Sequence, residues 1–170
     1  PFNGSLRPNP FKKWMQISLT LPSFEIRVFG PPSTSGTRDS FIQLALEKGC
    51  AGFPETQALK EQSPQRYKKV CTTLRSDGAY IESGEDDALI VKELAADPSA
   101  LGIFGYSFLA ENSDKVSAAT INNVAPSPET VSSGEYPVSR SLFFYVKMAH
   151  LEKVAGLEEF VDIFLSEDLI

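Results

Sequence analysis

Histidine is nearly absent from this sequence, since His150 is the only one among 170 residues. A Ser-His-Asp catalytic set or a histidine-based metal site needs a well-placed imidazole. His150 follows a predicted strand and lies between Lys147 and Glu152, so we interpret it as a surface residue. Basic residues are also in deficit, because 16 Lys and Arg face 22 Asp and Glu and give a formal net charge of -6. Nucleic-acid binding needs a clustered positive excess, so the composition argues against a nucleic-acid partner.

Long apolar runs are missing as well, since no stretch reaches the 18 or more residues of a membrane-spanning helix. The first residue is Pro1, with no initiating Met and no basic, apolar leader, and we interpret the chain as a processed or truncated piece. Cysteine is scarce, with only Cys50 and Cys71, which are 21 positions apart. The pair is compatible with a structural disulfide in an oxidising compartment, and equally with two unrelated buried thiols.

The chain does contain enough apolar material for a packed domain, because 42% of its residues are hydrophobic and 22% are charged. Short runs with strand character alternate with longer segments of helical periodicity. This order predicts an α/β fold with a mainly parallel central sheet flanked by helices. The predicted strands are residues 25–29, 79–82, 101–106, 116–121 and 142–147. The predicted helices are residues 11–17, 37–49, 64–74, 86–96, 107–112 and 156–165, with a capped segment at 127–133.

The loop at residues 30–39, Gly-Pro-Pro-Ser-Thr-Ser-Gly-Thr-Arg-Asp, joins the first predicted strand to a helix and has the composition of an anion site. The first N–H groups of a helix have no internal partner and carry partial positive charge. Ser35 and Thr37 add hydroxyl donors, and Gly36 lets an oxyanion approach the backbone closely. Arg38 offers a planar fork that matches two phosphate oxygens. The plainer alternative is that the hydroxyls only cap the helix.

Two other interpretations of polar clusters fit less well. An ATP-hydrolysing P-loop needs four residues between its glycines and then Lys, whereas five separate Gly30 from Gly36 and Thr37 follows. The carboxylates of residues 85–87 lie at the start of a predicted helix. At that place carboxylates more often interact with the helix dipole than bind a calcium ion. We therefore expect neither a metal nor a cofactor.

Three segments stand out, in this order: Gly30-Pro-Pro-Ser-Thr-Ser-Gly-Thr-Arg-Asp-Ser-Phe41, Leu101-Gly-Ile-Phe-Gly-Tyr-Ser-Phe-Leu109 and Ser133-Gly-Glu-Tyr-Pro-Val-Ser-Arg-Ser-Leu142. Together they resemble the periplasmic phosphate-binding proteins of high-affinity phosphate transporters. The resemblance implies a single lobe of a type II periplasmic binding protein. In that family a Ser-Gly-Thr triplet at a helix N-terminus holds phosphate from the second lobe, which implies Ser35, Gly36 and Thr37 as ligands here.

The sequence departs from this family at one position. Many members carry an arginine four residues before the serine of the triplet, where this chain has Pro31. Arg38 matches a Ser-Gly-Thr-Arg variant of the family and is the predicted substitute for that charge, although it could instead point away and pair with Asp39 or Glu25. Arg140 falls where the family's chain crosses between lobes for the second time, and it either braces the hinge or lines the cleft.

The resemblance also implies how the chain is divided. Residues 1–137 correspond to the second lobe, and residues 138–170 to the hinge crossover and a strand-helix segment that returns toward a first lobe that is largely absent. The apolar surface of the return segment would then be exposed, so a dimer or a swapped assembly of the isolated chain would be unsurprising. Because the family works in an oxidising compartment, the resemblance favours a disulfide between Cys50 and Cys71.

The expected function is phosphate binding as the substrate-binding component of an ABC transporter for phosphate uptake, with a membrane permease as partner and the periplasm as location. We do not expect an enzyme. One alternative is a binding or adhesion module that kept the fold and lost the ligand. The other is an enzyme acting on a phosphate ester, which would need a general base or a metal within reach of Ser35, and the sequence offers no clear candidate.

Overall fold

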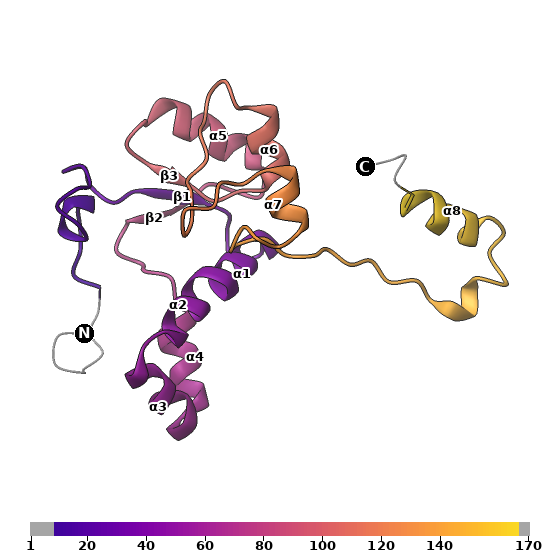
Figure 1. The fold of residues 1–170 in the computed structure, drawn as a ribbon, viewed down its shortest axis with the longest axis horizontal. Helices are drawn as coiled ribbons and strands as arrows, with labels where there is room; N and C mark the ends of the chain where they lie inside the picture. The colour runs from indigo at the N-terminus through magenta and orange to yellow at the C-terminus, as the bar shows by residue number, and fades with distance from the viewer. Residues whose placement is uncertain (1–8, 167–170) are drawn as a thin grey trace. The chain divides into compact units, whose positions relative to one another are not determined.

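The computed structural model describes residues 9–166 and contains a parallel sheet in the order β2-β1-β3. The central strand β1 (Val28–Gly30) pairs with β2 (Tyr80–Glu82) on one side and with β3 (Leu101–Gly102) on the other. Both neighbours run parallel to it, as Figure 1 shows. The predicted α/β class with a mainly parallel sheet is therefore confirmed.

Helices surround this short sheet and occupy most of the predicted positions. The structure contains α1 (Gly36–Phe41), the π-helical η3 (Ile42–Glu47), α2 (Lys48–Ala51), α3 (Pro54–Gln62), α4 (Pro64–Thr72), α5 (Asp87–Ala96), α6 (Tyr106–Glu111), α7 (Pro128–Ser132), α8 (Leu157–Phe164) and the short 3-10 turns η2 (Trp14–Gln16) and η4 (Met148–His150). Helix α1, η3 and α2 follow one another without a break, so one continuous helix leads away from the loop after β1 (Figure 1). None of the described helices is long and apolar enough to cross a membrane.

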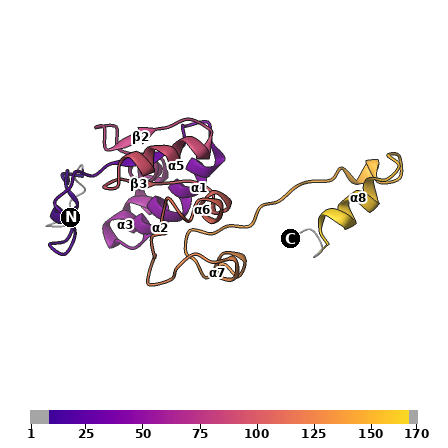
Figure 2. The same ribbon diagram turned by 90° about the horizontal axis from the view of Figure 1, so that it is seen from above.

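The core lies where α5 packs on the sheet. Helix α5 contacts both β1 and β3, and it lies along the strands in Figure 2. Ile90 and Val91 of α5 are 0% and 4% exposed, and Phe29 of β1 is buried as well. Burying apolar side chains of this size contributes roughly 1.5–3 kcal/mol each. This packing fixes the position of β1, and with it the loop that follows.

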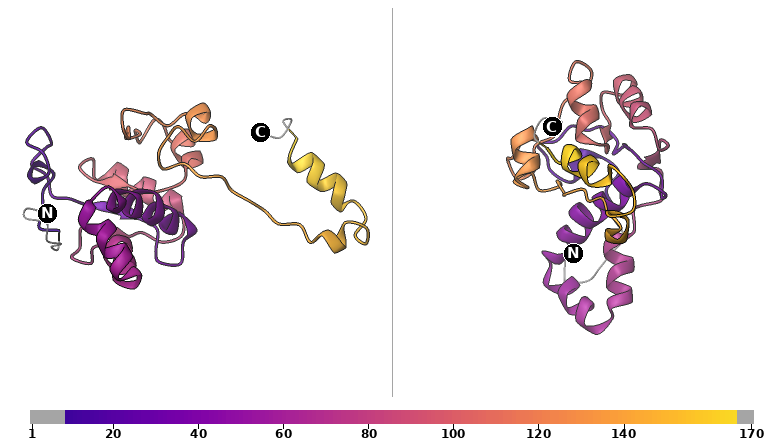
Figure 3. Two further views of the ribbon diagram at one scale, coloured as in Figure 1. Left: turned by 60° about the horizontal axis from the view of Figure 1, so that its bottom comes forward. Right: turned by 90° about the vertical axis from the view of Figure 1, so that its right-hand side faces the viewer.

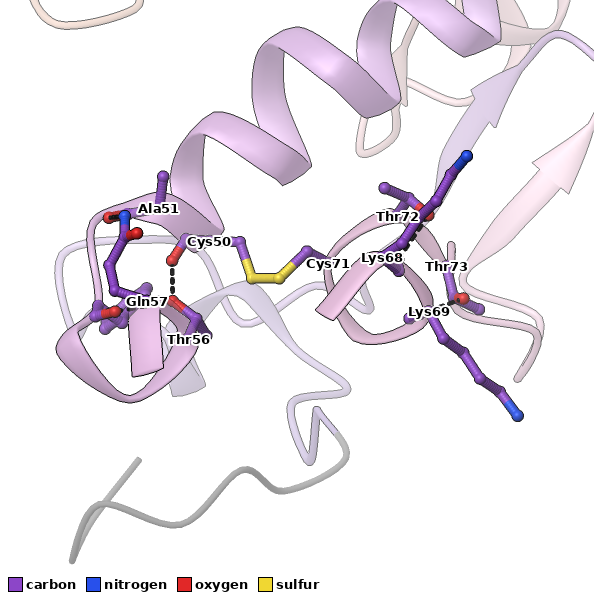
Figure 4. The surroundings of a disulfide bond; sticks show 10 residues. Cys50, Ala51, Thr56, Gln57, Lys68, Lys69, Cys71, Thr72 and Thr73 are labelled. Carbon is purple, nitrogen blue, oxygen red and sulfur yellow. Dashed lines mark hydrogen bonds between the residues drawn. A yellow bond between two sulfur atoms is a disulfide. The ribbon is translucent and has the colours of Figure 1, made fainter. Parts of the chain in front are cut away.

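A disulfide closes a helical arm formed by α2, α3 and α4. Cys50 at the end of α2 is bonded to Cys71 of α4, with Cα atoms 5.6 Å apart (Figure 4). Helices α3 and α4 pack side by side, and the arm extends away from the sheet (Figure 3). The Thr56 hydroxyl donates to the carbonyls of Cys50 and Phe53 and ties the start of α3 to the same corner. The arm thereby anchors the far end of the helix that begins at the loop.

Two of the predicted strands are wrong. Residues 116–121 form no strand, and their only bridge joins Ile121 to Val124. Residues 142–147 have the alternating pattern of a strand, but they pair with no other strand among the described residues. A strand needs a neighbouring backbone for its N–H and C=O groups, and neither segment has one here. Helix α3 was also not predicted, because its sequence is polar.

The chain divides into two compact units, the first ending at Arg140 and the second beginning at Ser141. Within the second unit, the ring of Phe144 meets that of Phe164 edge to face at 5.1 Å, and Phe160 stacks on Phe164. Several large apolar side chains of this unit are exposed, including Leu142, Phe143, Tyr145, Met148 and Ile163. The start of the predicted second lobe, residues 1–8, and the end of the predicted return segment, residues 167–170, lie outside the described residues.

Candidate functional site

The loop after β1 begins where the strand ends at the carboxyl edge of the sheet, and it enters α1 through Ser35. Ser35 has extended backbone angles and is the N-cap of α1, where its Oγ accepts the N–H of Thr37 at 3.2 Å. The Ser35 side chain is buried at 9% exposure, whereas Gly36 is exposed. Capping therefore occupies only one acceptor position of the Ser35 oxygen, and its hydroxyl hydrogen stays free to donate.

Gly36 presents open backbone at the first turn of this helix. Its N–H donates to no acceptor among the residues that the structure describes. A Cβ placed on Gly36 would meet a single neighbour within 4 Å, a guanidinium nitrogen of Arg140 at 3.8 Å. An unpaired N–H at a helix start, on a residue with open space at its Cβ position, is the kind of local geometry that receives an oxyanion.

Arg38 does not point into the open space in front of Gly36. Its guanidinium forms an ion pair with Glu82 at the end of β2, and its centre lies 5.3 Å from the centroid of the Tyr80 ring. The side chain is only 17% exposed. The sequence suggested Asp39 or Glu25 as the acidic partner of Arg38, and the structure shows neither in that role. Arg38 instead links the helix to the neighbouring strand.

Tyr80 clamps the turn after β1. Its hydroxyl donates to the carbonyl oxygen of Pro31 at 2.6 Å. The ring also packs against Gly30, where an added Cβ would lie 2.5 Å from the Tyr80 hydroxyl oxygen, so a larger residue there would force the ring to shift. Burial raises the pKa of Tyr80, while the nearby Arg38 lowers it and Glu82 raises it. The phenol therefore stays protonated at neutral pH and keeps its hydrogen bond to the loop.

The carboxylates near the loop have structural partners. Glu85 accepts a hydrogen bond from the Thr34 hydroxyl, and Asp86 caps α5 by accepting the N–H of Ala88 at 2.9 Å. Asp87 accepts the N–H of Gly105 at 2.9 Å. Within residues 9–166, no three His, Cys, Asp or Glu side chains come together in a way that could hold a metal ion.

Arg140 reaches the loop from a distant part of the sequence. It follows a turn in which the N–H of Ser139 donates to the carbonyl of Tyr136 at 2.9 Å. The Tyr136 hydroxyl in turn donates to the carbonyl of Ala119 at 3.1 Å. The Arg140 side chain is exposed, and it forms no ion pair or hydrogen bond with the described part of the chain. The structure thus brings Arg140 together with the Ser35-Gly36-Thr37 triplet.

Sequence reasoning missed Tyr80 and Glu82 as members of this site. A usable signal was present, because residues two apart on a strand share one face. In addition, the carboxyl ends of neighbouring parallel strands meet at one edge of a sheet, which is where loops of α/β proteins bind ligands. The predicted strand at 79–82 therefore placed both side chains next to the loop after β1.

A family profile described as "PBP superfamily domain" matches residues 2–168. Protein SphX of Synechocystis is 30% identical over 159 residues, which cover 91% of this chain and 40% of that protein. The phosphate-binding protein PstS of Bacillus subtilis is 29% identical over 146 residues, covering 85% of this chain and 38% of that protein.

A solved structure shows the same similarity in three dimensions. The crystal structure of a possible phosphate binding protein from Planctomyces limnophilus is 29% identical, with a TM-score of 0.59, over 94% of this chain and 49% of that one. The chain spans about two fifths of the length of the two curated relatives named above. Because the profile match extends over nearly all of its residues, the chain belongs to the PBP superfamily.

Proposed function

We propose that this chain binds inorganic phosphate at the start of α1, through the Ser35 hydroxyl, the Gly36 N–H and Thr37, with positive charge from arginine. The observation that carries the proposal is the unpaired N–H of Gly36, with an Arg140 guanidinium nitrogen 3.8 Å from the Cβ position of the same residue, in a chain similar to the phosphate-binding protein PstS. Two or three donors of this kind match the oxygens of a tetrahedral oxyanion. Arg38, predicted from the sequence as a ligand, lies next to the triplet and is paired with Glu82.

The protein that contains this chain would then be the substrate-binding component of an ABC transporter for phosphate uptake, exported and working with a membrane permease. The similarity to PstS proteins supports this role. A binding protein needs no general base, and among the described residues Ser35 is hydrogen-bonded to a backbone N–H rather than to a base. We therefore propose binding and transport rather than catalysis.

Residues 138–170 are proposed to return toward a first lobe, which would cover exposed side chains such as Leu142 and Tyr145. Without that cover, large exposed apolar surface favours association of the chain with itself. Tight binding in a two-lobed cleft depends on closure that removes water from the anion. A chain that supplies one side of the cleft is therefore expected to bind phosphate weakly and to distinguish it poorly from sulfate.

The test is a titration of the ¹⁵N-labelled 170-residue chain with inorganic phosphate, followed through its amide signals. We expect saturable chemical-shift changes of the Gly36 and Thr37 amide signals. The Gly49 signal should not shift, because Gly49 lies in α2 away from the loop. Thr37→Ala should weaken binding by about 1 kcal/mol, the scale of one hydrogen bond.

Each other outcome has a clear meaning. Unmoved Gly36 and Thr37 signals at saturating phosphate would contradict the proposed site. Submicromolar binding that is selective over sulfate would show that the cleft is complete in this chain, and that the expectation of weak binding is wrong.

A further inference from the structure

We propose that the two arginines at the loop have different roles: Arg140 contacts the bound phosphate, and Arg38 positions the loop without touching the anion. This inference rests on the proposed function and assigns the positive charge within that same site. The sequence favoured Arg38 as the ligand because it follows the triplet directly. The contacts in the structure point the other way.

The guanidinium of Arg38 already has two partners, a carboxylate and an aromatic ring. The ion pair with Glu82 satisfies part of its donor fork, and the Tyr80 ring lies 5.3 Å from the guanidinium centre. An anion at Gly36 would have to compete with the Glu82 carboxylate for this guanidinium. Since the side chain is 17% exposed, moving it out would also uncover the ring beneath it.

These contacts give Arg38 a different task. Tyr80 holds the turn by donating to the Pro31 carbonyl, and its ring lies against Gly30. By stacking on Tyr80 and pairing with Glu82, Arg38 ties α1 to β2 across the base of the loop. Its effect on an anion would pass through the shape of the loop, which makes it a positioning residue.

Arg140 has the complementary properties. One of its guanidinium nitrogens lies 3.8 Å from where a Gly36 Cβ would stand, and that Cβ position has no other neighbour within 4 Å. The guanidinium has no acidic partner within the described part of the chain. A single oxyanion at Gly36 could therefore accept from the backbone N–H and from a charged donor of the same neighbourhood that has no other acceptor among the described residues.

The place of Arg140 in the chain adds a consequence. It is the last residue of the first compact unit, immediately before the segment that begins at Ser141. The turn at Tyr136–Ser139 holds the preceding backbone through the hydrogen bonds given above. An anion held by Arg140 would thus fix the point at which the chain leaves this unit.

The experiment compares Arg140→Gln, Arg38→Gln and Arg66→Gln in the 170-residue chain, with phosphate and separately with sulfate. Arg66 is an exposed arginine of α4 and serves as the matched control for loss of one positive charge. Binding is measured from the Gly36 amide shift, and folding from the melting temperature.

We expect Arg140→Gln to weaken phosphate and sulfate binding alike, by about tenfold, because one charge-assisted hydrogen bond is lost. Its melting temperature should stay that of the parent chain. Arg38→Gln should lower the melting temperature together with binding, and Arg38→Lys, which can still pair with Glu82, should restore part of both. Arg66→Gln should change neither.

The assignment is overturned if Arg140→Gln binds phosphate as the parent chain does, or if Arg38→Gln loses binding with no change in melting temperature. Failure of the proposed function looks different, because then the parent chain itself shows no Gly36 shift with phosphate. The parent titration therefore separates the two hypotheses before any variant is compared.

Discussion

At the amino end of β1, charged side chains are matched with one another. Arg27 pairs with Asp97 at 3.1 Å, and Asp77 accepts hydrogen bonds from both Arg75 and Lys12. At the carboxyl end, Arg38 is paired with Glu82, but Arg140 lies beside the open backbone of Gly36 with no acidic partner among the described residues. Both ends of one short strand are rich in charge, and at the carboxyl end the described residues leave the Arg140 guanidinium without an acidic partner.

The comparison separates charges that hold the fold from a charge that is available to a ligand. Arg75 also donates to the carbonyl of Phe11, so the Asp77 cluster fastens the chain before β1 to the segment before β2. A pocket of about 400 Å³ lies at this end, lined in part by Lys12, Arg27 and Asp77. Its cations already have carboxylate partners, and a second anion there would face those carboxylates. A pocket alone is thus a weaker sign of an anion site than an unmatched donor.

The largest effect is expected from breaking the clamp at the carboxyl end with Gly30→Ala. The new methyl group would lie 2.5 Å from the Tyr80 hydroxyl oxygen, so the ring and the Pro31 turn would have to shift. We expect a loss of about 1–3 kcal/mol in the free energy of unfolding, as for other overpacked sites, together with loss of the phosphate-induced Gly36 shift. Chemical denaturation and the phosphate titration measure the two effects.

Gly49→Ala is the matched control for this change. Gly49 lies in α2 with nothing near its Cβ position, so alanine there should stabilise the helix by up to about 1 kcal/mol and leave binding intact. Equal phosphate binding by Gly30→Ala and the parent chain would show that the clamp does not shape the site.

The amino end can be tested through pH with Asp77→Asn. Hydrogen bonds from Arg75 and then from Lys12 hold the pKa of Asp77 far below its usual range. A carboxyl group with a lowered folded pKa stabilises the fold above its unfolded pKa of about 3.9, and that contribution is lost as the pH falls from there toward the folded pKa. We expect the parent chain to be more stable than the variant at pH 7 and the difference to shrink in acid.

Unfolding curves across this pH range, with phosphate titrations at pH 7, give the readout. A stability difference that persists unchanged below pH 3 would mean that the Asp77 charge is not its source. Weaker phosphate binding by Asp77→Asn would contradict the division of roles between the two ends of the strand.

The smallest effect is expected for Arg27→Gln, which removes a positive charge at the amino end of β1, away from the proposed phosphate site. The Arg27 side chain is 46% exposed, so its ion pair with Asp97 should contribute no more than about 1 kcal/mol. Phosphate binding should not change, although the net charge changes by the same amount as in Arg140→Gln. If both variants lose affinity equally, the anion responds to overall charge and the local contact of Arg140 is not needed.

The sequence predicted the parts of the fold that depend on local patterns. The strand at residues 79–82 and the helix at 86–96 both form, because short apolar runs and helical periodicity decide them locally. Helix α3 was missed, since Pro54 at its first position was a valid start signal but the residues after it are mostly polar. The segment 142–147 shows the opposite error, because strand propensity without a neighbouring strand is not enough to form one.

For the candidate site, the sequence predicted the loop and the helix that starts after it, but it could not decide which contacts the arginines make. The cap at Ser35 and the exposed Gly36 follow from the Ser-Gly-Thr order at a helix start. The partner of Arg38 depends on Glu82, 44 residues away, and the approach of Arg140 to Gly36 spans more than a hundred residues. Such contacts are set by the order of strands and by turns far along the chain.

Pro31 limits which side chains the loop after β1 can accept. Its side chain is fully buried, and its carbonyl accepts a hydrogen bond from the Tyr80 hydroxyl. An arginine at position 31 would place a charge in a space shaped for a small apolar ring, which carries a large desolvation cost. An anion at the start of α1 would therefore draw its positive charge from arginines elsewhere in the chain, because the buried turn at position 31 could not supply it.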